Sequence, residues 1–147
     1  MNTDQSEHPY PSNKKSMADF QVDLEEPNSR KKLAIMLMKL FEHWELNQRS
    51  QTNLLGISEL SRSTLDKYRK GDSPLPKSRD MLDRAGYLLA IHKALRLLYP
   101  KNPQVRYSWV SRSNRAFDNL TPLEVMQSQG VLGIARVARY LDFIRGQ

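Results

Sequence analysis

Apolar side chains recur at every third or fourth position along most of the chain after Asn28, a spacing that places them on one face of an α-helix. The first such stretch predicts a helix over residues 30–45, with Asn28 or Ser29 able to cap its beginning. The positions expected to face inward from this helix are Leu33, Leu37, Leu40, Phe41 and Trp44. The folded part of the chain is therefore predicted to begin with an amphipathic helix.

Two short helices are predicted next, over residues 48–55 and 62–70. A polar residue that can cap a helix precedes each of them, and a glycine that can adopt the left-handed conformation follows each of them. These residues are Asn47 and Ser61 at the beginnings and Gly56 and Gly71 at the ends. Leu65 and Tyr68 give the second helix an inward face. The pattern predicts two helices joined by a turn that begins at a glycine.

A longer helix is predicted from Ser78 to about Tyr99, after a loop that contains two prolines. Its apolar residues form a stripe wider than one buried face requires. They are Leu82, Ala85, Leu88, Leu89, Ile91, Leu95 and Leu98. We expect this helix to be the central element of the fold, or an interface as well. A short helix is expected around residues 104–110.

The segment Thr121-Pro122-Leu123-Glu124 predicts the beginning of another helix. Thr121 can cap it, a proline stands at the first helical position, and Glu124 completes a capping box. This helix leads to Gly130, and a last helix is expected from Val131. Its inward positions are Ile134, Val137, Ala138, Leu141 and Ile144. Because no convincing strand pattern and no internal repeat are visible, the predicted fold class is all-α.

Residues 1–28 differ from the rest of the chain. They contain two lysines and six acidic residues, so their net charge is −4, and the first 16 residues hold almost no aliphatic side chain. Such a segment buries too little apolar surface to offset the entropy of ordering it. We expect residues 1–28 to form a mostly disordered or extended tail, residues 29–99 a first helical domain, and residues 100–147 a second, smaller one.

Composition excludes several classes of protein. No stretch approaches the roughly 20 consecutive apolar residues that a membrane-spanning helix needs. The chain has no cysteine, which removes disulfide frameworks, thiolate nucleophiles and cysteine-based metal sites. The acidic leader, residues 1–28, has neither the apolar centre of a secretory signal nor the composition of a transit peptide. We therefore expect a cytoplasmic protein without a membrane partner.

Charge points to a polyanionic partner. The whole chain carries +7, so the residues after the acidic leader carry +11. The two short helices fit a helix-turn-helix, whose second helix reads base edges in the major groove of duplex DNA. The candidate DNA-binding residues are Gln48, Arg49, Arg62, Ser63, Thr64, Lys67 and Lys70. Arg62 suits guanine, whereas the lysines suit phosphates. The alternative is an ordinary helical hairpin with solvated charges.

The sequence does not indicate an enzyme. His8, His43 and His92 are too dispersed for a metal-binding motif, and the six glycines form no phosphate-binding loop. His92 has apolar neighbours on its helix, so packing is its expected role. We expect no catalytic residues, no metal site and no cofactor.

Two sets of motifs resemble the Xre/MbcA/ParS-type antitoxins of toxin-antitoxin operons. The first set resembles the Xre-like helix-turn-helix of that family and comprises Trp44-x-Leu46, Leu54-Leu55-Gly56-Ile57-Ser58, Ser63-Thr64-Leu65 and Tyr68-Arg69-Lys70-Gly71. The second resembles its C-terminal toxin-binding domain and comprises Trp109, Ser113-Asn114, Phe117, Leu120-Thr121-Pro122-Leu123-Glu124-Val125 and Leu141-x-x-Ile144-x-Gly146.

The resemblance implies an antitoxin that represses its own operon with its N-terminal half and silences a toxin with its C-terminal half. The implied toxin is a RES-type enzyme that consumes NAD, and the DNA-bound form is expected to be a homodimer on a palindromic operator. The implied toxin-binding residues are Trp109, Leu123, Arg136, Arg139, Ile144, Arg145 and Gly146. Two alternatives remain open: a stand-alone helix-turn-helix regulator with a C-terminal dimerisation or ligand domain, and a pure interaction module.

Overall fold

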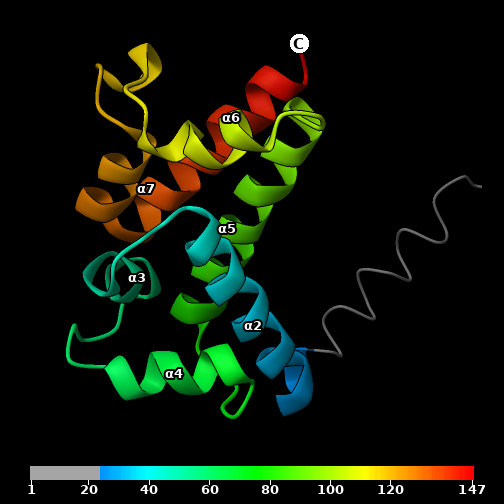
Figure 1. The fold of residues 1–147 in the computed structure, drawn as a ribbon, viewed down its shortest axis with the longest axis vertical. Helices are drawn as coiled ribbons and strands as arrows, with labels where there is room; N and C mark the ends of the chain where they lie inside the picture. Colours follow the sequence, from blue (N-terminus) through cyan, green and yellow to red (C-terminus); the bar gives the residue numbers. More distant parts are fainter. Residues whose placement is uncertain (1–23) are drawn as a thin grey trace, which may run out of the picture.

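The computed structural model describes residues 24–147, and within this range the fold is all-α, as predicted (Figure 1). No strand occurs in residues 24–147. The α-helices are α2 (Pro27–His43), α3 (Gln48–Leu55), α4 (Arg62–Lys70), α5 (Arg79–Leu98), α6 (Pro103–Ser108) and α7 (Pro122–Arg145). Two single 3₁₀ turns, η1 (Trp109–Ser111) and η2 (Arg115–Phe117), connect α6 to α7. The tail expected over residues 1–28 lies, up to residue 23, outside the described residues.

Helix α2 begins earlier than the sequence analysis predicts. The expected caps Asn28 and Ser29 lie inside the helix, Pro27 is its first residue, and Glu26 stands at the cap position without a side-chain cap bond. The preset φ angle of proline suits a first helical position, which explains the earlier start. Arg30 is buried and fixes this end, since its Nε donates to the Leu75 carbonyl oxygen at 2.9 Å.

The pair α3 and α4 matches the predicted boundaries. The Asn47 side chain accepts a hydrogen bond from the Ser50 amide at 2.8 Å, and Gly56 and Gly71 end the two helices in the left-handed conformation. The expected cap by Ser61 is wrong in its chemistry. Ser61 occupies the cap position, but its ψ of 37° departs from the extended backbone that lets a side-chain oxygen reach the free amides.

Helix α5 is the central element, with α2, α6 and α7 packed around it (Figure 1). Ser78 caps it by accepting from the Met81 amide at 3.2 Å. Its fully or nearly buried residues are Met81, Ala85, Leu88, Ile91, Ala94 and Leu95. The wide apolar stripe is therefore covered largely from within the chain, and Leu97 is the large apolar residue of α5 that remains exposed.

Helix α7 consists of two helical segments that meet at Gly130. The capping box predicted at Thr121 and Glu124 is present, with reciprocal hydrogen bonds of 3.0 and 2.8 Å. Gly130 has φ 63° and ψ −147°, so the chain bends there, as the predicted division into two helices requires. The buried side chains from Phe41 in α2 to Leu141 in α7 form one contiguous core. The core thus continues across the domain boundary predicted at residues 99 and 100.

Candidate functional site

The first candidate surface is the outer face of α3 and α4. Leu54 and Leu55 of α3 and Leu65 and Tyr68 of α4 are buried, so the two helices are held on the core by their inner faces. Burial raises the pKa of the Tyr68 phenol above its usual 10.0, because desolvation disfavours the charged phenolate. The predicted DNA-binding residues point the other way. Gln48, Arg49, Arg62, Ser63, Lys67 and Lys70 are exposed, and Thr64 is half-buried.

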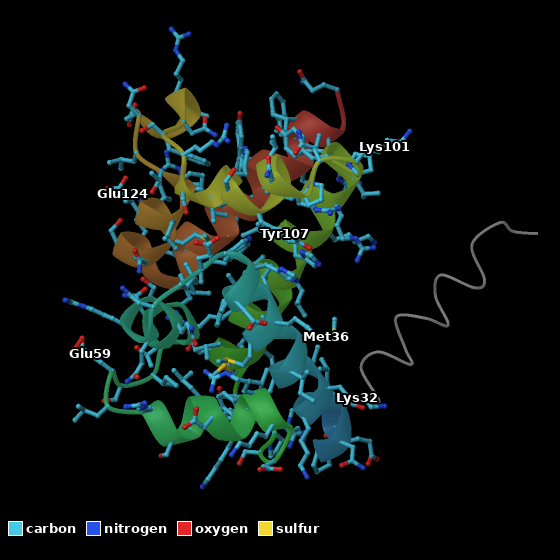
Figure 2. All side chains as sticks on the ribbon, in the orientation of Figure 1. Lys32, Met36, Glu59, Lys101, Tyr107 and Glu124 are labelled. Atoms are coloured by element: carbon cyan, nitrogen blue, oxygen red, sulfur yellow. The ribbon has the colours of Figure 1, made fainter. Side chains whose placement is uncertain are left out.

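The turn between α3 and α4 is tied back to the first turn of α3. Gln48 Nε2 donates to the Glu59 carbonyl oxygen at 3.0 Å, and Arg49 Nε lies 3.5 Å from the Glu59 carboxylate. Figure 2 places Glu59 on this turn, at the outer edge of the molecule. Leu60, the next residue, is 90% exposed. Two residues predicted to contact phosphate therefore also order the turn that leads into α4.

The outer face of α4 is strongly basic. Its nine residues include Arg62, Lys67, Arg69 and Lys70 against a single acid, Asp66. Asp66 pairs with Arg69 through an ion pair three residues apart. The remaining three cations form no ion pair with any carboxylate in residues 24–147. This face can therefore accept a polyanion without first breaking internal contacts of its cations.

The predicted toxin-binding residues do not share one surface. Trp109 is only 9% exposed and stacks on Tyr140 with ring centroids 6.4 Å apart, so it belongs to the core beneath the surface. Leu123 and Ile144 are half-buried. Arg136, Arg139, Arg145 and Gly146 are exposed on the last segment of α7 and just after it.

Two of the predicted arginines meet in a groove between α5 and α7. This groove of about 330 Å³ is lined by Arg139, Asp142 and Arg145 from α7 and by Lys93 from α5, among other residues. Asp142 accepts a hydrogen bond of 2.7 Å from Arg145, which leaves the groove with a net positive charge. Arg136 lies apart from it, with its guanidinium 5.2 Å from the centre of the Phe117 ring.

The apolar pattern of the sequence did not predict two exposed apolar residues of α7. Leu132 is 74% exposed and Phe143 is 64% exposed. Both fall outside the inward set Ile134, Val137 and Leu141, each of which is fully buried. The signal that could have found them is their spacing, because Leu132 lies four residues before Arg136 and Phe143 four residues after Arg139.

The histidines of the described chain lie in an aromatic stack, not in a metal site. His43 and Tyr107 are parallel with ring centroids 4.2 Å apart, and His92 lies 6.4 Å from the same tyrosine. Burial, together with the nearby Arg96, His43 and Arg106, lowers the pKa of His92 below 6.5. Residues 24–147 contain no cluster of His, Asp or Glu that could hold a metal ion, and none of their helices is long and apolar enough to span a membrane.

Comparison with known proteins bears on the C-terminal surface. Residues 94–146 match the family described as the antitoxin Xre/MbcA/ParS C-terminal toxin-binding domain. The chain is also 35% identical over 108 residues to the uncharacterized protein y4oB of Sinorhizobium fredii (strain NBRC 101917 / NGR234), a similarity that covers 74% of this chain and 80% of that protein. The matched range includes α7, its exposed arginines and the α7 side of the groove against α5. The protein belongs to the Xre/MbcA/ParS antitoxin family and carries its toxin-binding domain.

Proposed function

We propose that this antitoxin neutralises a RES-type, NAD-consuming toxin with its C-terminal region and represses its own operon with α3 and α4. The observation that carries the first half is the match of residues 94–146 to the toxin-binding domain. The observation that carries the second half is the exposed basic face of α4, which has three cations without an ion-pair partner in residues 24–147. In this proposal the protein has no catalytic residues of its own.

In the DNA complex, α4 is the recognition helix. Its N-terminal residues Arg62 and Ser63 face base edges in the major groove, with Arg62 donating its planar pair of N–H groups to guanine O6 and N7. Lys67 and Lys70 contact phosphates along the same face. Gln48 and Arg49 contact phosphate from the beginning of α3, and Arg49 exchanges its exposed ion pair with Glu59 for that contact.

Thr64 lies on the boundary between the buried and exposed faces of α4, where it is half-buried. It supports the placement of Arg62 and Ser63 against the major groove of DNA.

The α4 helix lies at one end of the long axis of the molecule, and the chain ends near the other (Figure 1). The two binding surfaces are therefore far enough apart to be occupied at the same time.

The DNA-bound form is a homodimer in this proposal. A single recognition helix reads too few base pairs for useful specificity, and two copies about 34 Å apart read a palindrome. The apolar stripe of α5 does not supply the interface, because α2 and α7 already bury most of it within the chain. Exposed apolar residues on the outer face of α2, Ile35 and Met36, are available instead.

In the toxin complex, the end of α7 blocks the active site. The segment Ile144–Gln147 follows the last fully buried residue of α7, Leu141, so most of it is free of the core. A guanidinium followed by glycine suits a cleft that binds a phosphate-bearing dinucleotide, because glycine allows close backbone approach. Deleting Arg145–Gln147 is expected to preserve folding and operator binding and to reduce protection against the toxin.

The test is copurification with the product of an adjoining RES-type gene, combined with a mobility-shift assay on the promoter of that gene pair. The proposal predicts a stable complex and retarded promoter DNA. A protein that binds the promoter but retains no adjoining gene product would instead be a stand-alone regulator. If the Arg145–Gln147 deletion protects fully at equal abundance, inhibition comes from the helical surface around residues 109–125.

A further inference from the structure

The last segment of α7 presents a narrow stripe of exposed residues on the side away from the core. Leu132, Arg136, Arg139 and Phe143 follow one another at intervals of four, three and four residues. At 3.6 residues per turn, these positions fall within an arc of about 60° around the helix axis. We call these four residues the outer stripe. All four are exposed, Leu132 and Phe143 by 74% and 64%.

The core lies on the opposite side of the same helical segment. Ile134, Val137 and Leu141 are fully buried and pack in the core that α7 shares with α5. The core is therefore formed without the outer stripe. Two large apolar side chains left in water on one helix face, flanking two cations, are typical of a surface that binds a partner.

The two arginines in the middle of the stripe are available to a partner. Neither Arg136 nor Arg139 forms an ion pair with a carboxylate of residues 24–147. Arg136 is also oriented, because its guanidinium lies over the Phe117 ring at 5.2 Å. A guanidinium held by an aromatic ring loses less side-chain entropy on binding and keeps its N–H edge free for a carboxylate.

We propose that the outer stripe is the main docking surface for the toxin, and that the toxin meets it with two apolar depressions separated by carboxylates. Leu132 and Phe143 fill the depressions, which lie about 16 Å apart along the helix axis. Arg136 and Arg139 pair with the carboxylates between them. This inference rests on the proposed function, since it specifies how the toxin is held while Arg145–Gln147 reaches the active site.

A second copy of this chain fits the stripe less well than a toxin does. In a two-fold symmetric dimer the same surface patch faces itself. The outer stripe contains two arginines and no acid, so self-association would bring like charges together in a region that is already basic. Its position inside the range that matches the toxin-binding domain also favours the toxin.

The test compares variants of the full chain in titration calorimetry with the purified RES-type protein encoded beside the antitoxin gene. Leu132→Glu and Phe143→Glu are each expected to weaken binding by about 30-fold or more, as for central interface residues. Leu60→Glu is the matched control, because Leu60 is 90% exposed on the turn before α4 and lies outside residues 94–146. It should change the affinity by less than about 3-fold.

Two further readouts separate the stripe from fold and from charge alone. The Leu132→Glu and Phe143→Glu variants should have the circular dichroism and the promoter affinity of the wild type. If either variant unfolds, Leu132→Ala and Phe143→Ala replace them and should also weaken toxin binding. Replacing Arg136 and Arg139 by alanine should weaken binding and flatten its dependence on salt.

The inference is overturned if the wild-type protein binds the toxin and the folded Leu132→Glu and Phe143→Glu variants bind it with an affinity within about 3-fold of the wild type. It is also overturned if those variants bind the toxin normally but turn a dimer into a monomer in sedimentation, because the stripe would then hold a second copy. If the wild type binds no such toxin, the proposed function itself has failed, and the inference fails with it.

Discussion

The break at Gly130 sets the direction of the last segment of α7, and the Gly130→Ala variant tests this break. With φ 63° and ψ −147°, Gly130 occupies a backbone region that essentially only glycine adopts. A methyl group added there meets no crowding, because its nearest neighbour is Arg84 Nη2 at 3.9 Å. The cost of the substitution is therefore backbone strain alone, about 1–3 kcal/mol of the free energy of unfolding.

Gly86→Ala is the matched control. Gly86 lies in the middle of α5 and is exposed, and a Cβ added there would meet no side chain and no other element within 4 Å. Alanine is favoured over glycine in a helix interior, so this variant should gain about 0.5–1 kcal/mol. The same chemical change thus has opposite signs at two positions, and the sign depends only on the local backbone.

The assay is urea unfolding followed by the fluorescence of the buried Trp44 and Trp109, with far-ultraviolet circular dichroism as a second probe. We expect the unfolding midpoint of Gly130→Ala to fall and that of Gly86→Ala to rise, with unchanged slopes. A Gly130→Ala variant as stable as the wild type, or more stable, would refute the reasoning. It would mean that α7 passes residue 130 as one continuous helix, in which alanine is the better residue.

Three other predictions concern an anchor, the DNA face and pH. Arg84→Ala should cost about 2 kcal/mol of unfolding free energy, because Arg84 Nη1 donates to the two carbonyl oxygens at the end of α3 at 3.2 and 3.3 Å. Replacing the exposed Arg79 by alanine should cost less than about 0.5 kcal/mol. Equal losses in the two variants would refute this prediction. Arg62→Ala should weaken promoter binding by about 1–3 kcal/mol and relax the sequence preference. Lys70→Ala should weaken binding to all DNA sequences alike and reduce the dependence of the affinity on salt. Equal effects of the two variants in fluorescence anisotropy would mean that the base-reading face is misplaced. Because the pKa of His92 is lowered, the folded state binds the imidazole proton more weakly than the unfolded state does. The contribution of neutral His92 to the free energy of unfolding is therefore fully present above pH 6.5 and is lost as the pH falls below it. His92→Gln should flatten this loss in thermal melts, and an unchanged pH dependence would contradict the assignment.

Much of the fold could be predicted because its helix ends are decided locally. Asn47 and Thr121 each accept a hydrogen bond from the amide three residues further along, and Gly56 needs only its own left-handed backbone. The beginning of α2 was missed because Pro27 starts the helix without any side-chain cap. Ser61 failed as a cap because its backbone is set by the turn before it, which tertiary contacts with α3 hold.

The candidate surfaces were harder to predict, because exposure depends on what covers each residue. The motif residue Trp109 lies in the core, where Tyr140 of a distant helix stacks on it. Leu132 and Phe143 are apolar yet exposed, since α5 covers only the opposite face of their helix. Periodicity places residues on a face, whereas only the packed structure shows which face has no neighbour.

In the proposed function, this protein protects cells by neutralising a toxin that consumes NAD. The measurement that tests this most directly is the NAD content of cells that express the proposed RES-type toxin, alone and together with this chain. We expect NAD to fall with the toxin alone and to stay near normal when this chain is present at equal or higher abundance. NAD that falls equally in both cultures, with both proteins intact and abundant, would contradict it.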